Sequence, residues 1–475
     1  MNRREFLRAS LIATGGMMLN ACASNSSPPV PPNLIPTTAL GASPVKSNDT
    51  ILVVGAGIAG IAAAREIKKR GYAVIVLEAR NRIGGRVWTD RSLGASLDLG
   101  ASWIHGIQNN PIAHLAREFN MQTQPTNYDN IWRYEADGKE LSASAERAME
   151  ARFERLVKDA DQLRLQRENR SEPDLSLGAA FDAIVARQNP SATERRHLNY
   201  MVNGAIEHEY AADVNQLSFF NYDQGEEFGG GDALFPNGYG EMMTRLADGL
   251  DVRLEQIVQK IDYDVRGVTV TTDRGKFDGA RVIVTLPLGV LKSDAVKFTP
   301  ALPDNKIAAI KKLGMGLLNK VYLRFPFPFW AKEPELLGYI GENKGEWAEW
   351  LNLYKYTRAP ILLAFNAGTY GREIEKLADA EIVARALGVL RQIYGAAATD
   401  PTGYLITRWA SDPYTRGSYS YVGVGASGKD YATLSEPVND RVFFAGEHTH
   451  RAYPSTVHGA YLSGVREAER VTRIK

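Results

Sequence analysis

A glycine-rich turn lies between two apolar segments in TILVVGAGIAGIAAAREIKKRGYAVIVLE, residues 50–78. Residues 51–54 are an unbroken apolar run, which is typical of a strand buried on both faces. Residues 61–70 are rich in alanine and carry their charges on one side, which favours a helix. Residues 73–77 predict a second strand, and Glu78 follows it. The order strand, turn, helix, strand predicts an α/β fold around a parallel sheet.

The turn has the spacing G-x-G-x-x-G, and each glycine has a physical role. Gly55 permits a tight turn, Gly57 lets the backbone approach a pyrophosphate, and Gly60 lets the helix pack against the strand. The N–H groups at the helix start attract phosphate charge, and a carboxylate after the second strand binds ribose hydroxyls. The sequence therefore predicts a dinucleotide site. Its predicted contacts are Gly55, Ala56, Gly57, Ile58, Ala59, Gly60, Glu78, Ala79 and Arg80.

A second glycine pair, Gly84-Gly85, precedes Arg86 in EARNRIGGRVWTD. A nicotinamide dinucleotide does not require this motif, which offers a further backbone approach and a cation to the same pyrophosphate. LDLGASWIHG follows at residues 97–106. Together these segments resemble the flavin-containing amine oxidase family, and GASWIHG is most similar to its polyamine oxidase branch. The resemblance covers nearly all of residues 49–475 and implies FAD as the cofactor.

The resemblance also implies the architecture. A Rossmann-like FAD-binding domain would be interleaved with an α+β substrate domain. The FAD-binding domain would comprise residues 49–109, 229–323 and 405–475, and the substrate domain residues 110–228 and 324–404. We expect a charged, solvent-facing helix at 142–170, a strand at 361–365, a helix at 378–394, and a strand at 442–445 that returns to the first sheet, before a helix that starts near residue 457.

Further cofactor contacts follow from the resemblance. Val258 would hold the adenine through a backbone group. The helix that starts near residue 457 would direct its N-terminus at the isoalloxazine and favour negative charge on the reduced ring. The full set of further contacts is Gly84, Gly85, Arg86, Gly100, Ala101, Ser102, Trp103, Val258, Trp409, Gly446, Glu447, Thr456 and Val457.

The chemistry that the resemblance implies is amine oxidation. A neutral amine gives a hydride from its α-carbon to the flavin, water hydrolyses the imine, and O2 is reduced to H2O2. Lys320 occupies the place where the family has a lysine bonded through water to the flavin. On a strand, Lys320 and Tyr322 would share one face, and Val321 and Leu323 the other. Alternation does not decide whether the face of Lys320 meets solvent or a polar cavity.

Substrate contacts are also inferred from the resemblance. Tyr419 matches one side of an aromatic cage. Thr456 stands opposite, where many members have tyrosine, and this departure from the two-sided cage looks like the spermine-oxidising members. His105 would lie at the active-site tunnel, and Glu209, together with Glu207, would add negative charge near its mouth. The predicted catalytic residues are Lys320, His105, Tyr419 and Thr456, and the predicted substrate-binding residues are His105, Glu209 and Tyr419. Trp409 and Tyr421 fit core packing equally well.

Two alternatives remain open. An L-amino-acid or monoamine oxidase has the same fold, and the amino-acid oxidase needs a cation for the substrate carboxylate, which Arg133 or Arg416 would supply. The other alternative is a flavin-bound binding protein without turnover. The presence of Lys320 disfavours it.

The N-terminal residues resemble export signals. Arg3-Arg4 precedes an apolar run, as in twin-arginine signals, and Leu19-Asn20-Ala21-Cys22 resembles a bacterial lipobox. Residues 1–22 would be the signal and residues 23–48 a Pro/Ser-rich linker. The implied location is the periplasm or bacterial envelope, with a membrane tether through lipidated Cys22; a chance arginine pair is the alternative. Because Cys22 is the only cysteine, we expect no internal disulfide.

Charge and histidine spacing exclude other partners. The net charge is +1, so no overall field attracts nucleic acid. The histidines lack metal-ligand spacing beside carboxylates, and we therefore expect no metal. The expected partners are an amine substrate and O2. The oligomeric state is left open.

Overall fold

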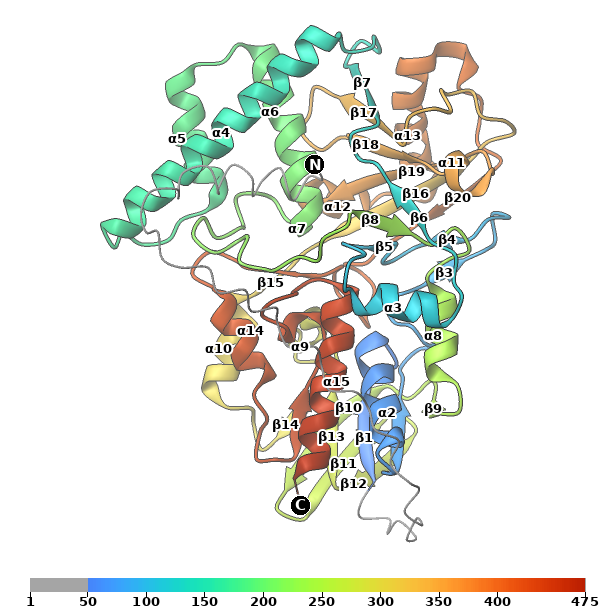
Figure 1. The fold of residues 1–475 in the computed structure, drawn as a ribbon, viewed down its shortest axis with the longest axis vertical. Helices are drawn as coiled ribbons and strands as arrows, with labels where there is room; N and C mark the ends of the chain where they lie inside the picture. Colours follow the sequence, from blue (N-terminus) through green and yellow to red (C-terminus); the bar gives the residue numbers. More distant parts are fainter. Residues whose placement is uncertain (1–49, 475) are drawn as a thin grey trace, which may run out of the picture.

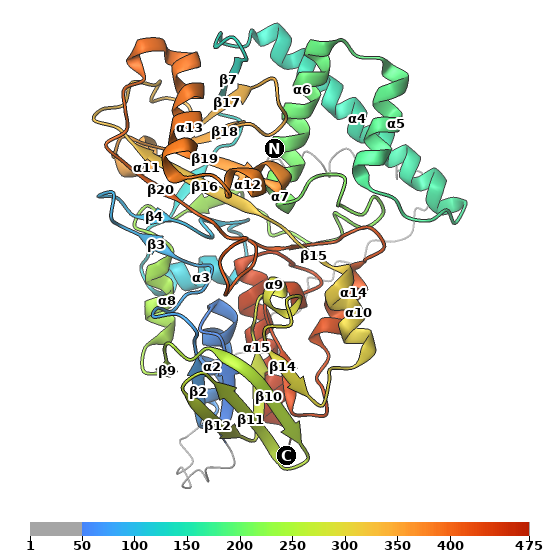
Figure 2. The same cartoon turned by 180° about the vertical axis from the view of Figure 1, so that it is seen from behind.

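The structure, a computed structural model, describes residues 50–474. In Figures 1 and 2 a five-stranded sheet lies in the lower half of the molecule and a six-stranded sheet in the upper half. No helix within residues 50–474 is long and apolar enough to cross a membrane. The predicted signal at 1–22, the predicted linker at 23–48 and Cys22 lie outside the described residues.

The five-stranded sheet is parallel throughout, in the order β22-β13-β1-β2-β9. β1 lies at its centre and is buried on both faces, as its unbroken apolar sequence predicts. β22 comes from late in the chain and pairs with β13, so a late segment does return to the first sheet. The bounds are β1 Ile51–Val54, β2 Val74–Leu77, β9 Asp251–Arg253, β13 Arg281–Val284 and β22 Val442–Phe444.

Two helices from opposite ends of the described chain pack side by side on one face of this sheet (Figure 1). They are α2 (Ile58–Lys69) and α15 (Val457–Arg473). α2 begins at Ile58 rather than at residue 61, because Gly57 already serves as its N-cap. A Cβ added to Gly464 of α15 would lie 2.1 Å from the Ala59 carbonyl oxygen, so the contact depends on that glycine. α3 (Pro111–Glu118) and α8 (Gly240–Ala247) complete this layer.

The other face of the parallel sheet packs against a four-stranded sheet of order β12-β11-β10-β14. Apolar residues of both sheets and of three helices form one core there. The strands are β10 Val258–Asp264, β11 Gly267–Thr272, β12 Gly275–Gly279 and β14 Lys297–Thr299, and the helices are α9 Leu288–Leu291, α10 Asp304–Lys312 and α14 Gly428–Ser435.

The upper sheet has the order β20-β16-β19-β18-β17-β7. Val321 and Leu323 face a core formed with α13, whereas Tyr322 faces the opposite side, so the predicted alternation along β16 is confirmed. The elements are β7 Ile131–Glu135, β16 Leu318–Arg324, β17 Leu336–Ile340, β18 Glu349–Asn352, β19 Ile361–Ala367, β20 Gly403–Ile406, α11 Tyr354–Thr357, α12 Gly368–Ile374 and α13 Asp379–Tyr394.

A layer of helices stands beside the upper sheet: α4 (Ala143–Asn169), α5 (Leu177–Gln188) and α6 (Ala192–Val202) (Figure 1). α4 agrees with the charged helix expected at 142–170. A π-helical turn at Asn203–Glu207 continues α6 into α7 (His208–Tyr210). Such turns are rare and frequently mark functional sites.

Short strands connect the two halves. They are β3 Thr89–Asp90, β4 Leu97–Asp98, β5 Trp103–Ile104, β6 Gln124–Thr126, β8 Asp232–Leu234, β15 Gly314–Met315 and β21 Ser420–Tyr421, and 3₁₀ turns occupy Gly395–Ala397 and Glu447–Thr449. The domain boundaries expected after residues 323 and 404 each fall inside a strand of the six-stranded sheet, β16 and β20. After β7, the chain thus returns to the upper sheet at Leu318, before residue 323.

Candidate active site

A cavity of about 550 Å³ opens at the carboxyl ends of the parallel strands and continues toward the upper sheet. Residues at the carboxyl ends of four of these strands line it. Gly55, Glu78 and Thr285 directly follow β1, β2 and β13, and Gly446 lies two residues after β22. This edge is where open parallel sheets bind their ligands.

The first glycine turn has the geometry that its sequence predicts. Gly55 has φ +104°, and a Cβ on Gly60 would lie 1.9 Å from the Gly55 carbonyl oxygen. A Cβ on Gly57 would meet nothing within 4 Å, so the space before the N-terminus of α2 is open to a ligand. The N–H groups of the first helical turn have no partner within the helix and are available to a phosphate.

Glu78 is held as an acceptor at the end of β2. Its Oε2 accepts a hydrogen bond from the Ala56 N–H at 2.7 Å, and its Oε1 accepts one from the Arg80 N–H at 2.9 Å. Burial raises the pKa of Glu78, although these two hydrogen bonds oppose the shift. Each carboxylate oxygen keeps a further lone pair, which suits ribose hydroxyls.

The second glycine motif lies against the first, since Gly84 forms a bridge with Gly57. Gly84 and Gly85 have φ +98° and +56°. Arg86 then donates from Nη1 to the Ser418 carbonyl oxygen at 2.8 Å and to Glu447 Oε1 at 2.9 Å. The Arg86 guanidinium therefore joins the second glycine motif to the segments that contain Ser418 and Glu447.

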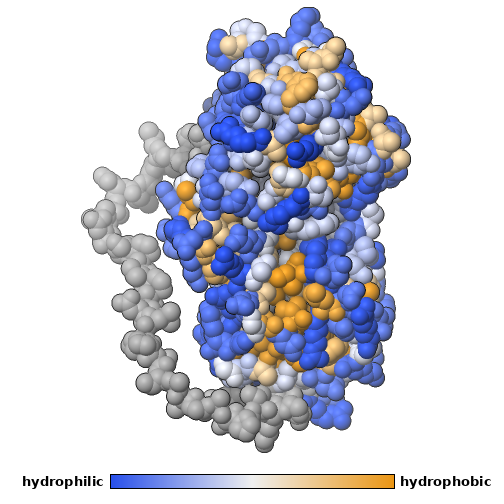
Figure 3. All heavy atoms as spheres, turned by 90° about the vertical axis from the view of Figure 1, so that its right-hand side faces the viewer, coloured by the Kyte–Doolittle hydropathy of each residue, from blue (hydrophilic) through white to orange (hydrophobic). Residues whose placement is uncertain are grey.

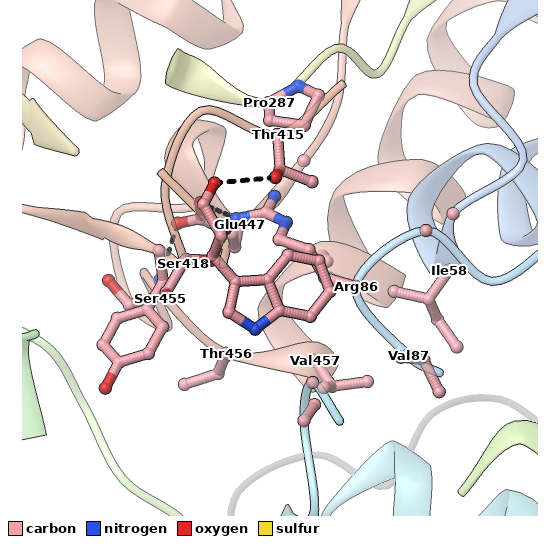
Figure 4. A pocket seen from close by; sticks show the side chains of 18 of the residues that line it. Ile58, Arg86, Val87, Pro287, Thr415, Ser418, Glu447, Ser455, Thr456 and Val457 are labelled. Carbon is pink, nitrogen blue, oxygen red and sulfur yellow. Dashed lines mark hydrogen bonds and ion pairs between the residues drawn. The ribbon is translucent and has the colours of Figure 1, made fainter. Parts of the chain in front are cut away.

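Glu447 is a buried carboxylate at the centre of this junction (Figure 4). Its Oε2 accepts from the Ser420 hydroxyl at 2.6 Å and from the Ser455 N–H at 3.1 Å. Burial alone would raise the pKa of Glu447, but the Arg86 guanidinium and the other partners together lower it. Glu447 thus stays ionised and fixes Arg86 in place.

Thr456 is the N-cap of α15. Its Oγ1 accepts from the Gly459 N–H and donates to the Tyr453 carbonyl oxygen, both at 3.0 Å. Thr456 and Val457 both line the cavity, so the N-terminus of α15 lies beside it (Figure 4). Thr456 therefore caps the N-terminus of α15. Because it is not aromatic, it also leaves one side of the expected aromatic cage open.

The structure brings almost all predicted site residues to this one cavity. Ala56 and Gly60 do not line it: Ala56 donates to Glu78 from behind, and Gly60 packs on Gly55. The cavity therefore fits the predicted dinucleotide, with glycine space for phosphate, a cation and acceptors. The predicted residues that line it are Gly55, Gly57, Ile58, Ala59, Glu78, Ala79, Arg80, Gly84, Gly85, Arg86, Gly100, Ala101, Ser102, Trp103, His105, Glu209, Val258, Lys320, Trp409, Tyr419, Gly446, Glu447, Thr456 and Val457.

Lys320 points inward, which resolves the choice that alternation left open. Its side chain is buried, with the residue 4% exposed, and its Nζ donates to the carbonyl oxygens of Asp98 and Gly100 at 2.7 and 2.6 Å and to Ser102 Oγ at 2.5 Å. Nζ also lies 5.9 Å from the centre of the Trp103 ring. Burial lowers the pKa of Lys320, and the nearby Asp98 carboxylate only partly opposes this.

Asp98 is a buried acid that sequence reasoning missed. Its carboxylate accepts from the Thr89 hydroxyl at 2.5 Å and from the Tyr239 N–H at 3.0 Å. Burial raises the pKa of Asp98 despite these hydrogen bonds. No sequence signal distinguished it, because Asp98 lies beside a recognised motif but contacts Lys320 only in the folded chain.

Aromatic side chains form the walls beyond Lys320. The Tyr419 hydroxyl donates to the His208 carbonyl oxygen at 2.7 Å, and Trp409 Nε1 donates to the Leu99 carbonyl oxygen at 3.3 Å. The Trp103 ring lies 6.3 Å from Tyr128 and 6.1 Å from Phe365. Trp409 is thus both buried and part of the cavity lining, and Tyr421 likewise.

His105 is oriented by a residue that sequence reasoning missed. Its Nδ1 lies 2.8 Å from Asp232 Oδ2, and the same oxygen accepts from the Tyr128 hydroxyl at 3.2 Å. Since a carboxylate only accepts, His105 Nδ1 carries the proton when the imidazole is neutral, which leaves Nε2 as an acceptor. Asp232 comes from β8, more than a hundred residues away in sequence, so spacing gave no signal.

The two predicted acids at the mouth differ. Glu209 lines the cavity. Glu207 does not: it is buried in the π-helical turn, where it accepts from Asn203 Nδ2 and the Val214 N–H and pairs with Lys344 at 2.6 Å. The expectation that Glu207 adds charge near the mouth is therefore wrong, because that carboxylate is used inside the helix layer.

The two arginines considered for a substrate carboxylate also differ. Arg133 lies outside the cavity lining and pairs with Glu146 and Glu150 of α4. Arg416 lines the cavity, but its backbone packs against Gly289 beyond the end of β13, on the side of the parallel sheet. Within residues 50–474, no group of three or more His, Cys, Asp or Glu side chains is arranged to hold a metal ion.

Comparisons with known proteins agree with this geometry. The family described as flavin containing amine oxidoreductase matches residues 58–472. Among curated relatives, Lysine-specific histone demethylase 1 homolog 1 of Oryza sativa subsp. japonica is 39% identical over 470 residues, covering 94% of this chain and 54% of its own length. Polyamine oxidase 4 of the same rice is 37% identical over 438 residues, covering 89% of this chain and 88% of its own.

A solved structure of putrescine oxidase bound to putrescine superposes with a TM-score of 0.75. It is 22% identical and covers 90% of this chain and 99% of its own, so it supports the α/β fold with a parallel Rossmann-like sheet. The chain spans little more than half the length of the demethylase homologue that it matches.

Proposed function

Because this chain belongs to the family of flavin-containing amine oxidoreductases, we propose that it oxidises polyamines and passes the electrons to O2. It is an FAD-dependent amine oxidoreductase. The chemistry that bound FAD would supply is that of a hydride acceptor for the carbon beside the substrate nitrogen. The remaining work, which is binding, orientation and exclusion of water, falls to the side chains around the cavity.

Lys320 is the residue that we assign to the reaction centre. It lies where the lining passes from the glycine motifs to the aromatic walls, beside Trp103 and Gly100. Its ammonium donates to three oxygen acceptors, whereas the neutral amine that burial favours has a lone pair, which can accept a hydrogen bond from an ordered polar group, such as a water, in the cavity. The N-terminus of α15 adds a positive dipole end on the same cavity, which suits a cofactor that becomes more negative on reduction.

The observation that carries the polyamine assignment is the combination of aromatic walls and acids beyond Lys320. Trp103, Tyr128 and Tyr419 offer ring faces, on which amines pack well. Asp232, through His105, and Glu209 supply negative character on the same lining. Arg133 is engaged by α4, so it does not offer a cation for the carboxylate of an amino-acid substrate.

The decisive experiment is a substrate panel on the purified FAD-loaded protein. Peroxide formation and anaerobic flavin bleaching should occur with spermine, spermidine or acetylated polyamines, and be much slower with tyramine, L-leucine and L-phenylalanine. Activity on the amino acids alone would select the amino-acid oxidase. A bound flavin that no amine bleaches would select the binding protein without turnover.

A second candidate substrate is a methylated lysine side chain, since one relative at 39% identity is named as a histone demethylase homologue. The same panel should include a methylated lysine peptide beside its free amine analogue. Faster bleaching by the peptide than by every polyamine would replace the polyamine assignment.

We also propose that the protein is exported and tethered to the envelope of a bacterium. The support is the sequence around Arg3-Arg4 and Cys22. Replacing both arginines by lysine should retain the protein in the cytoplasm on cell fractionation, and Cys22→Ala should release it from the membrane fraction. Unchanged fractionation of both variants would reject the export route and the lipid tether.

A further inference from the structure

A second cavity, of about 390 Å³, lies where α9, the end of α10, β15 and β21 meet (Figures 1 and 2). This cavity is called the recess below. Leu313, Met315 and Tyr421 are buried and form its floor. The Tyr421 ring packs directly on Gly314, where an added Cβ would lie 2.0 Å from the ring. The recess therefore has a closed, well-packed floor.

All four charged residues that line the recess are cations. They are Lys292, Lys311, Lys312 and Arg416. Among the described residues of the lining, none is Asp or Glu. The whole chain has 56 lysines and arginines and 55 acidic residues, so a lining of one sign is a local feature and does not reflect the composition. Positive charge gathered in a concave surface attracts anions.

Lys292 removes an obstacle to an anion. α10 ends at the recess, and the free carbonyl groups at a helix C-terminus carry partial negative charge. Lys292 Nζ donates to the carbonyl oxygens of Ile310, Lys311 and Leu313 at 2.8, 2.8 and 2.7 Å. The protein itself thus neutralises the helix end, and the other three cations are left to a ligand.

The other three cations have no counter-ion within residues 50–474. Lys311, Lys312 and Arg416 are exposed and take part in no ion pair with a described residue. Other exposed cations of this chain do: Arg245 and Arg385 each pair with a glutamate one helical turn earlier. Like charges around one recess repel each other, and an anion shared between them relieves this repulsion.

Arg416 is held beside the recess by its backbone. Its φ is +52°, a left-handed conformation that residues other than glycine seldom adopt. A Cβ added to Gly289 of α9 would lie 2.6 Å from the Arg416 carbonyl oxygen and 2.9 Å from the Arg416 Cβ, so the two backbones touch. The start of the side chain is thus fixed, which reduces the entropy lost when the guanidinium binds an anion.

The number and type of these cations indicate the class of anion. A carboxylate carries one negative charge and would leave two cations unpaired, whereas a phosphate monoester carries nearly two and a diphosphate more. A guanidinium binds two phosphate oxygens at once, and ammonium groups act beside it as point charges. Because Lys311 and Lys312 do not line the main cavity, the phosphates of FAD do not account for them.

We propose that the recess binds a phosphate group, as a monoester or a diphosphate, through Lys311, Lys312 and Arg416. This site is separate from the reaction centre at Lys320 and does not depend on which amine is oxidised. Arg416 and Tyr421 line both cavities, so the phosphate lies next to the wall of the main cavity. Its source is a soluble compound or an anionic lipid headgroup, and the test separates the two.

The test is calorimetry on the FAD-loaded full chain in a buffer free of phosphate and sulfate. FAD then occupies the glycine motifs and keeps the added phosphate from binding there. Pyrophosphate should bind more tightly than inorganic phosphate, and acetate at equal ionic strength should not compete. In Lys311→Gln/Lys312→Gln the Kd of pyrophosphate should rise by about 10-fold or more, because hydrogen bonds to charged groups are lost. Absence of binding of both phosphates to the wild type would overturn the proposal.

The matched control is Lys276→Gln/Lys297→Gln. It removes the same charge from two exposed lysines that line neither cavity, so its Kd should equal that of the wild type. Equal weakening in both double variants would show attraction by net charge alone and overturn the site. Release of FAD by pyrophosphate, seen as loss of flavin absorbance after gel filtration, would place the phosphate at the glycine motifs and also overturn it.

Two further probes identify the source of the phosphate. Glycerol 3-phosphate is a soluble monoester, and phosphatidic acid presents a monoester on a vesicle. Both are tested on Cys22→Ala, so that no lipid attached to Cys22 contributes. Binding of glycerol 3-phosphate without co-sedimentation on vesicles of phosphatidylcholine and phosphatidic acid would assign a soluble ligand. Co-sedimentation that requires phosphatidic acid and is lost in Lys311→Gln/Lys312→Gln would assign a lipid headgroup. Binding of pyrophosphate alone would restrict the ligand to a diphosphate.

Discussion

At the scale of single residues, Lys320 shows how the fold changes the properties of a common side chain. An ammonium normally lies in water, but here three oxygen atoms and the Trp103 ring surround it. The cost of burial favours the neutral amine, whereas the three acceptors favour the ammonium. Burial is the larger effect, and the pKa of Lys320 is lowered.

Replacing Lys320 by methionine should slow amine oxidation while FAD stays bound. Methionine fills similar space but can neither donate nor hold a proton, and lost proton handling of this kind typically costs about 10²-fold or more in rate. Stopped-flow measurements of flavin reduction and of reoxidation by O2 would locate the affected step. Lys312→Met, an exposed lysine, is the control. Wild-type rates for Lys320→Met in both half-reactions would remove Lys320 from the mechanism.

The same residue should give stability a pH dependence. The native pKa of Lys320 lies below its unfolded value, so between the two the native state binds fewer protons. Its contribution therefore grows as pH rises through this window and is lost as pH falls through the native pKa. From about pH 8 to about pH 10, wild type should gain up to about 1.4 kcal/mol per pH unit over Lys320→Met. Urea denaturation at each pH would measure the unfolding free energy of both proteins. If the two free energies change with pH in parallel over this range, the assignment is contradicted.

The sequence predicted site residues well where a local motif carried them. Gly55, Gly57 and Glu78 belong to a pattern whose geometry is fixed by a turn and a helix start, so their places followed directly. Asp98 and Asp232 did not, because their roles depend on partners that meet only in the folded chain. Glu207 was misplaced for the same reason, since helical spacing does not reveal that Lys344 comes close.

At the scale of elements, the turn between β1 and α2 separates two uses of glycine. A Cβ on Gly60 would collide with the backbone of Gly55, whereas a Cβ on Gly57 would meet nothing in the protein. Gly60 thus serves packing, and Gly57 serves the ligand.

This difference predicts opposite behaviour for two alanine variants. Gly60→Ala should destabilise the FAD-free protein by about 1–3 kcal/mol, because a backbone oxygen cannot move aside as a side chain can. Gly57→Ala should unfold at the wild-type temperature without FAD and bind FAD more weakly. Thermal unfolding without ligand and fluorescence titration with FAD would measure both. Equal loss of stability in the two variants would contradict this division.

Element types were predictable where the periodicity was strong and the run was long. The strand at 51–54 and the helices near 142–170 and 378–394 appear as β1, α4 and α13. The sequence did not predict which sheet contains β16. Its alternation of apolar and polar residues is compatible with either the upper or the lower sheet. Only its pairing with β19 and β20 assigns it to the upper sheet.

At the scale of the whole molecule, one cavity is lined by both halves. The lower half contributes Glu78 and Glu447, and the upper half contributes Lys320 and Glu349. A ligand there contacts both cores and is bound only by the folded chain.

Removal of FAD should therefore lower the unfolding temperature of the entire chain. At a free FAD concentration of 100 Kd, the stabilisation is about 2.7 kcal/mol. Glu78→Gln, which keeps the size but weakens acceptance from ribose hydroxyls, should lose part of this gain. The FAD-free protein should also lose about 1–3 kcal/mol, because the Ala56 or the Arg80 N–H then loses its acceptor. Calorimetry of each form with and without FAD would measure it. If FAD does not change the unfolding temperature, the inference that its cavity is shared by both halves is contradicted.

The contact between α2 and α15 has a consequence for biosynthesis. The ribosome makes the first glycine turn well before β22 and α15, which complete its layer, because the strands of the upper sheet lie between them in the sequence. Until then the apolar face of the nascent α2 has no α15 to pack against and stays exposed to solvent. Chaperones should hold this chain until α15 has emerged, and FAD can be captured only after that point.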